Sequence, residues 1–224
     1  MKISIQAALL LGLILLLQEA ESVQLNHTPD VVTHITPANF TPSLTLTSHL
    51  EFSNPKEPIM HFRLDLINFN ISGWNAYSGR LGAGFNWVSE VDSEKSDGVL
   101  CNAVISLDSR KDQLNCLDSF LANPQNHLAS QVDRTINVDF IRELSSTSYN
   151  QDLSFANFTG YFTRPLVTND TLNDLNLTQG EKHRLSAIFG YWTGTWMRDF
   201  QIIEFDFEVP SIPSESELLS PFLL

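Results

Sequence analysis

The chain has few of the features that mark an enzyme, a nucleic-acid-binding protein or a membrane protein. It has only two cysteines in 224 residues, and it has 13 basic residues against 26 acidic residues. The net charge of −13 is spread along the chain, which argues against nucleic acid and anionic membranes as partners. After the N-terminal segment, no apolar run approaches the roughly 20 residues that a transmembrane helix needs. We therefore expect no membrane span in the mature chain.

Sequence motifs of catalysis and metal binding are also missing. No His-x-His or His-Glu-x-x-His pair and no Gly-x-Ser-x-Gly turn is present, and the carboxylates are scattered. The glycines around Ala83 do not form a nucleotide loop, because no helix pattern and no Lys-Ser/Thr pair follows them. We expect that the protein is not an enzyme and holds no metal ion. The six histidines of the chain, none of which belongs to such a motif, are His27, His34, His49, His61, His127 and His183.

The N-terminal segment has the pattern of a secretory signal peptide. Lys2 supplies the positive start, an apolar run of about a dozen residues follows from Ala7 to Leu17, and Ala20-Glu21-Ser22 offers small residues for cleavage. The apolar run 218–224 is too short for a GPI-anchor signal, which needs about 10–20 apolar residues. We predict that residues 1–22 are removed and that the mature protein is secreted.

Asparagine-linked glycosylation sequons fit this secretory interpretation. Each Asn-x-Ser/Thr sequence is a candidate acceptor and so predicts a surface position in a secreted chain. Two of the six sequons bracket the loop near residue 170, which places that loop at the surface if they are used. The acceptors are Asn26, Asn39, Asn70, Asn157, Asn169 and Asn176.

The two cysteines, Cys101 and Cys116, are most simply one disulfide in an oxidising compartment. Two apolar stretches, 99–107 and 113–117, flank the polar cluster 108–112, which resembles a turn. A hairpin folded about this cluster sets the two cysteines opposite one another, within bridging distance. Closing a loop of this size stabilises the fold by about 3 kcal/mol in the chain-entropy estimate.

Short alternating segments dominate the rest of the chain. They predict an all-β fold, an antiparallel immunoglobulin-like β-sandwich of about nine to eleven strands in a single domain over 43–209. Residues 23–42 are expected to form an extended leader and 210–224 a flexible tail. The polar stretch 142–152 is expected to be a loop. The expected strands cover 44–52, 59–67, 79–87, 99–107, 113–117, 128–140, 153–162, 184–191 and 200–209.

The most informative stretch runs from Phe162 to Leu177. Arg164 lies at the end of a predicted strand, and Asp170 and Asp174 follow four residues apart in a loop. Arginine suits carboxylates because its planar fork bonds them in pairs. In one interpretation the three residues pin the loop against the sheet, and in the other they line a ligand site. Loop-locking ion pairs are commoner than ligand sites, which favours the first interpretation.

The order of these features resembles the DOMON family, named after the N-terminal region of dopamine β-monooxygenase. Residues 162–177 have an arginine, a leucine, a threonine and spaced aspartates in the family's order, followed by the apolar strand 185–191. The Leu-Gly-Ala-Gly-Phe strand at 81–85 and the cysteine hairpin also lie where the family has comparable elements. The resemblance covers about 44–209 and implies a β-sandwich that binds a ligand.

Some members of that family bind b-type haem between a methionine and a histidine, as in the cytochrome domain of cellobiose dehydrogenase. The resemblance implies the methionine within 98–103 and the histidine within 191–199, and neither residue stands there. Met197 or His183 could replace them only in a different geometry. We therefore expect no cofactor, with haem as the alternative.

Other DOMON-like modules are associated with sugars, which directs attention to the aromatic side chains. Trp192 and Trp196 flank Gly194 in a predicted loop and are the best candidates for stacking on a sugar ring, although tryptophans in sandwiches usually pack in the core. The sequence thus predicts a secreted, non-catalytic module that binds a carbohydrate-like ligand or an extracellular partner. The alternatives are a haem-binding electron-transfer domain and a purely structural extracellular domain.

Overall fold

The structure is a computed structural model of the chain. It describes residues 26–54, 56–72, 80–88, 96–104, 113–121, 130–132, 136–150, 154–170, 174–192 and 197–212.

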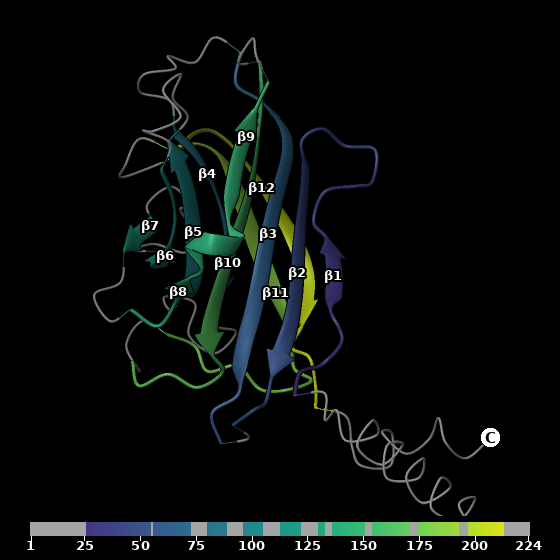
Figure 1. Ribbon diagram of the computed structural model, residues 1–224, viewed down its shortest axis with the longest axis vertical. Coiled ribbons are helices and arrows are strands. Elements are labelled where there is room, and N and C mark those ends of the chain that lie inside the picture. The colour runs from purple at the N-terminus through teal and green to yellow at the C-terminus, as the bar shows by residue number, and fades with distance from the viewer. Residues whose placement is uncertain are drawn as a thin grey trace, which may run out of the picture.

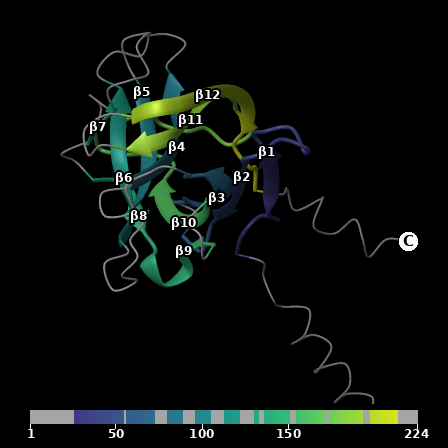
Figure 2. The same cartoon turned by 90° about the horizontal axis from the view of Figure 1, so that it is seen from above.

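Two antiparallel sheets pack face to face, and Figures 1 and 2 show them as two layers. In the first sheet the order is β1-β2-β3-β10-β8, and β9 also pairs with β10. Its strands are β1 (Val31–His34), β2 (Ser43–Glu51), β3 (Ile59–Asn70), β8 (Asp139–Phe140), β9 (Ser146–Tyr149) and β10 (Phe155–Pro165). In the second sheet the order is β12-β11-β4-β5-β6-β7. Its strands are β4 (Arg80–Val88), β5 (Ser96–Val104), β6 (Gln113–Leu121), β7 (Ser130–Val132), β11 (Lys182–Trp192) and β12 (Met197–Glu208).

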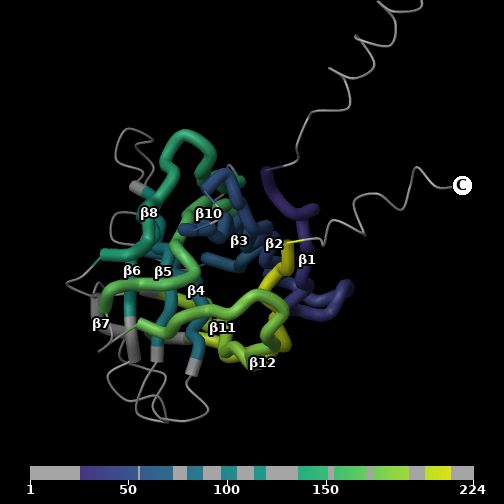
Figure 3. Tube along the Cα trace, turned by 90° about the horizontal axis from the view of Figure 1, so that it is seen from below, coloured from purple at the N-terminus to yellow at the C-terminus, as the bar shows by residue number. Residues whose placement is uncertain are grey.

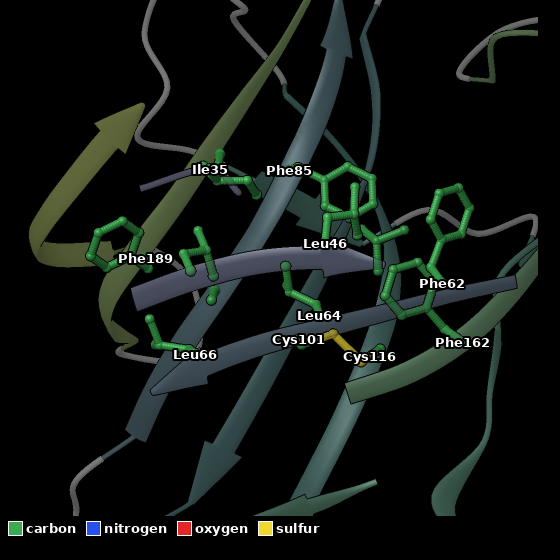
Figure 4. Close-up of a cluster of buried hydrophobic side chains, with 14 of the residues drawn as sticks. Ile35, Leu46, Phe62, Leu64, Leu66, Phe85, Cys101, Cys116, Phe162 and Phe189 are labelled. Carbon is green, nitrogen blue, oxygen red and sulfur yellow. A yellow bond between two sulfur atoms is a disulfide. The ribbon is translucent and has the colours of Figure 1, made fainter. Parts of the chain in front are cut away.

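The sandwich follows from the two-residue period of the strands. In β2 alternate side chains are buried, all of them apolar except Ser48, and in β3 alternate apolar side chains are buried from Met60 to Leu66. The residues between them are polar or exposed. Phe62 and Phe162 from the first sheet meet Phe85 from the second, with ring centroids 5.2–5.9 Å apart (Figure 4). The predicted all-β antiparallel sandwich is confirmed, and the described residues contain no α-helix.

The predicted disulfide is present between Cys101 in β5 and Cys116 in β6, which lie directly opposite in the ladder. Both cysteines point into the core, where the bond lies near Leu64 and Phe162 (Figure 4). Gly160 of β10 approaches it from the first sheet. A Cβ atom at Gly160 would lie 2.9 Å from the sulfur of Cys116 and 3.0 Å from that of Cys101. Glycine at this position therefore lets the first sheet close onto the disulfide.

Two expectations from the sequence were wrong. The single strand expected over 128–140 is two short strands, β7 and β8, which belong to different sheets. The loop expected over 142–152 contains a 3-10 turn, η2 (Arg142–Leu144), and the strand β9. Residues 136–140 alternate between apolar and polar whereas 142–152 do not, so local pattern did not determine where these edge strands lie. They are determined by pairing, of β7 with β6 and of β8 and β9 with β10.

The ends of the domain are also structured within the described residues. The stretch expected as an extended leader contributes β1, which pairs with β2. At the other end Val209 is buried, and Ile212 packs against the core. Residues 1–25 and 213–224, which include the predicted signal peptide and most of the predicted tail, lie outside the described residues. None of the helices described is long and apolar enough to cross a membrane.

We predict that Gly160→Ala destabilises the protein by about 1–3 kcal/mol, because the added methyl group has to displace the disulfide sulfurs. Urea unfolding followed by fluorescence measures the cost. In a Cys101→Ala/Cys116→Ala background the same substitution should cost at least about 1 kcal/mol less, since the sulfurs are gone. An equal cost in both backgrounds would contradict this account of the contact.

Candidate functional site

Arg164 lies between the sheets at the end of β10 and is almost completely buried, with 2% of the residue exposed. Its Nη1 donates a hydrogen bond of 2.6 Å to Oδ2 of Asp97, from β5 of the opposite sheet. The guanidinium also lies over the ring of Trp87, 5.1 Å from its centroid. The side chain therefore connects the two sheets through a charged hydrogen bond and a cation–π contact.

The same ion pair holds the connection between β10 and β11. Arg164 Nη2 donates to the carbonyl oxygen of Leu175 at 2.9 Å, and the backbone N–H of Leu175 donates to Asp97 Oδ2, also at 2.9 Å. The connection closes one end of the sandwich (Figure 3). A buried ion pair needs such additional partners, because desolvation of both charges is costly.

Three buried aspartates meet at this end of the molecule. Asp97, Asp118 and Asp174 each place one carboxylate oxygen within 4.8 Å of the others. The backbone N–H of Asn137 donates to Asp118 at 2.6 Å, and its Nδ2 donates to Asp174. The Arg164 guanidinium already supplies a cation to this cluster, so we interpret the cluster as structural.

Burial, and after it the negative charge of Asp97, raise the pKa of Asp174 to about 7. A hydrogen bond from Thr168 and the charge of Arg164 act in the opposite direction but are weaker. The neutral acid is therefore well populated near pH 7, which reduces the repulsion among the three carboxyl groups.

The sequence predicted the role of Arg164 but not its partner. Arg164 does pin the loop, through Asp97, while Asp174 contacts Asn137 and Thr168 instead of the arginine. Asp170 is half-buried beside them, and its carbonyl oxygen accepts a bond from the Thr168 hydroxyl.

Asp97 and Asp118 were missed, although a signal for them exists. Asp97 lies four residues before Cys101 and Asp118 two residues after Cys116, so both share the inward-facing parity of the cysteines. An acidic residue at an inward position is unusual, and it indicates that the carboxyl group is paired with a buried cation or is protonated. That signal would have identified both aspartates without a structure.

The two tryptophans proposed for sugar stacking are not placed. Trp196 and the side chain of Trp192 lie outside the described residues. Of the six sequon asparagines, Asn157 is half-buried: its Oδ1 accepts from the N–H of Asn68 and its Nδ2 donates to Ser148. The side chains of the others are exposed, as glycosylation requires: Asn26, Asn39, Asn70, Asn169 and Asn176.

A groove of about 150 Å³ crosses the outer face of the first sheet. Most of its exposed lining is apolar, including Leu144 of the turn η2 and the preceding Ile141, and side chains from β2, β3 and β10 add polar groups. The Arg63 guanidinium lies 5.6 Å from the ring centroid of Tyr161 and pairs with Asp65 at 2.8 Å. The lining residues are Asp30, Thr47, His49, His61, Phe62, Arg63, Ile141, Leu144, Tyr161 and Phe162.

The residues at the positions implied for haem do not fit an iron centre. Within β5, Cys101 is held in the disulfide, and the neighbouring Leu100 and Asn102 offer no thioether or imidazole ligand. His183 lies at the start of β11 and pairs with Glu181 at 3.7 Å. The methionine expected within 98–103 and the histidine expected within 191–199 are both missing from the sequence.

Comparison with known proteins gives no assignment. No family model matches the chain, and no curated protein is significantly similar to it.

We predict that Asp174→Asn removes a pH dependence of stability. The pKa of Asp174 is about 7 in the folded state and 3.8 in the unfolded state, so the folded state keeps the proton up to a higher pH. The free energy of unfolding should therefore fall as the pH rises from about 4 to 7, by at most about 1.4 kcal/mol per pH unit. The variant should equal the wild type near pH 4 and be more stable at pH 8 in urea titrations. Asp206→Asn, at an exposed carboxylate, is the control. A variant no more stable at pH 8 would refute the prediction.

Proposed function

We propose that the protein is a secreted, non-catalytic, DOMON-like module whose groove on the first sheet binds a small polar ligand such as a carbohydrate. The observation that carries the proposal is the groove, which combines an arginine, an aspartate and a tyrosine with apolar side chains. Its volume of about 150 Å³ suits one small ring rather than a large cofactor.

The chemistry of the groove supports such a ligand. Arg63 offers several fixed N–H donors, and the exposed Asp30 offers carboxylate acceptors, so hydroxyl groups can both donate and accept there. Tyr161 presents an aromatic ring with a polar tip, and Ile141 and Leu144 cover the apolar side. Binding sites typically combine apolar walls with a few polar groups that fix orientation.

The secreted setting rests on sequence. The signal-peptide pattern, the disulfide and the five exposed sequon asparagines agree with an extracellular module. An extracellular protein partner is the second possible occupant, since Leu144 on the groove wall is 56% exposed.

Titration of the secreted full-length chain with mono- and oligosaccharides, after a glycan-array screen, tests the proposal. We expect saturable binding that Arg63→Ala and Tyr161→Ala each weaken by about tenfold, or about 1.4 kcal/mol. Arg184→Ala is the matched control, because Arg184 is an exposed strand arginine paired with Glu204 at 3.0 Å on the other sheet. Equal binding by all variants, or a sharp Soret band after hemin addition, would contradict the proposal.

A further inference from the structure

Three histidines from separate parts of the chain come together on the outer face of the first sheet. His27 belongs to the N-terminal segment, His49 to β2 and His61 to β3. His49 and His61 are directly opposite in the ladder, with ring centroids 4.6 Å apart, and the His27 ring lies 5.4 Å from that of His49. The three residues form a row, which we call the histidine row.

Each ring has one nitrogen committed to an acceptor. His49 Nδ1 lies 3.0 Å from Asp30 Oδ1, His61 Nε2 lies 2.7 Å from Glu51 Oε2, and His27 Nδ1 lies 2.9 Å from the Thr28 carbonyl oxygen. The carbonyl oxygen and the ionised carboxylates can only accept hydrogen bonds, so the ring nitrogens that face them must be donors. In the neutral imidazole the other nitrogen then carries a lone pair. The row thus offers His27 Nε2, His49 Nε2 and His61 Nδ1 as potential ligands.

We propose that the histidine row is a binding site for a divalent transition-metal ion that prefers imidazole, Zn²⁺ or Cu²⁺. Ligating histidines usually donate their second nitrogen to a carboxylate or a backbone carbonyl, and all three members of the row have such a partner. Imidazole suits both ions, whereas the buried aspartates at the other site suit harder cations. His49, His61 and Asp30 also line the groove, so the ion would bind at one side of it, and the metal titration is done without added sugar.

The rings lie close together but do not yet converge on one point. Among the described His, Cys, Asp and Glu residues, only the three buried aspartates place their ligand atoms within 4.8 Å of one another, so the histidine rings have to turn before they share an ion. Zinc–nitrogen bonds of about 2.0–2.1 Å lie in the ring plane, so the centroids of two imidazoles on one tetrahedral ion are roughly 5 Å apart. The observed separations of 4.6 and 5.4 Å lie on either side of this value. The planes of His27 and His49 are already inclined by 53°, while those of His49 and His61 differ by only 12°. Binding therefore requires the His61 ring to turn out of its stack.

Charge and access at the row also favour a cation. The side chains of His49 and His61 are 30% and 27% exposed, so an ion can reach them from solvent. Asp30 and Glu51 face the row with negative charge, and Arg63, a cation on the same face, is paired with Asp65.

No sequence pattern marks this site, and we expected no metal ion. His49 and His61 are twelve residues apart, and His27 is twenty-two residues before His49, so no local spacing motif exists. Antiparallel pairing of β2 with β3, and of the N-terminal segment with β2, creates the row.

Isothermal titration of the chelator-treated, full-length secreted chain with ZnCl₂ and with CuCl₂ tests the proposal. We expect one ion per chain, with affinity about tenfold or more weaker in His49→Ala and His61→Ala. Nitrogen hyperfine structure in the Cu²⁺ electron paramagnetic resonance spectrum should diminish in both variants. Binding should also weaken as the pH is lowered, because protons compete with the ion for the ring nitrogens.

His34→Ala is the matched control, because His34 is an exposed histidine of β1 outside the row. Asp174→Asn tests whether the ion binds at the aspartate cluster instead. His49→Gln and circular dichroism separate loss of a ligand from loss of folding. The proposal is overturned if the wild type binds no stoichiometric ion, if His34→Ala weakens binding as much as His49→Ala, or if affinity follows Asp174→Asn.

Discussion

The ion pair between Arg164 and Asp97 is the interaction on which the described architecture depends. It joins β10 of one sheet to β5 of the other, and both partners also bond the backbone of Leu175. A buried arginine is stable only while its carboxylate is present, because an unpaired charge in the core costs several kcal/mol. This contact therefore joins the two sheets and the β10–β11 connection, and it does so through β5, the strand that also carries Cys101.

The polar interior and the outer face of the first sheet have different chemistry. The interior cluster of Asp97, Asp118 and Asp174 is closed, and its excess negative charge is reduced by Arg164 and by the proton that Asp174 retains. The outer face carries the groove and the histidine row, which are accessible to solvent. The buried charges therefore stabilise the sandwich, whereas the polar groups that could contact a ligand lie on the outer face.

Local pattern was sufficient to predict the long strands, the disulfide and the loop-pinning role of Arg164. Alternation in 59–67 and the placement of Cys101 and Cys116 about a polar turn determine these features directly. The partner of Arg164 and the histidine row could not be predicted in this way. Asp97 lies 67 residues before Arg164, and His49 meets His61 only across a ladder, so both depend on which strands pair. The short edge strands β7 and β8 were missed for the same reason.

A double-mutant cycle on Arg164 and Asp97 tests the central claim most directly. The free energy of unfolding would be measured in urea for Arg164→Met, Asp97→Asn and the double variant. We predict that each single substitution costs about 3–5 kcal/mol and that the double variant costs less than their sum by at least about 1.5 kcal/mol. If the cost of the double variant equals the sum of the two single costs to within about 0.5 kcal/mol, the pair does not connect the sheets and this account is contradicted.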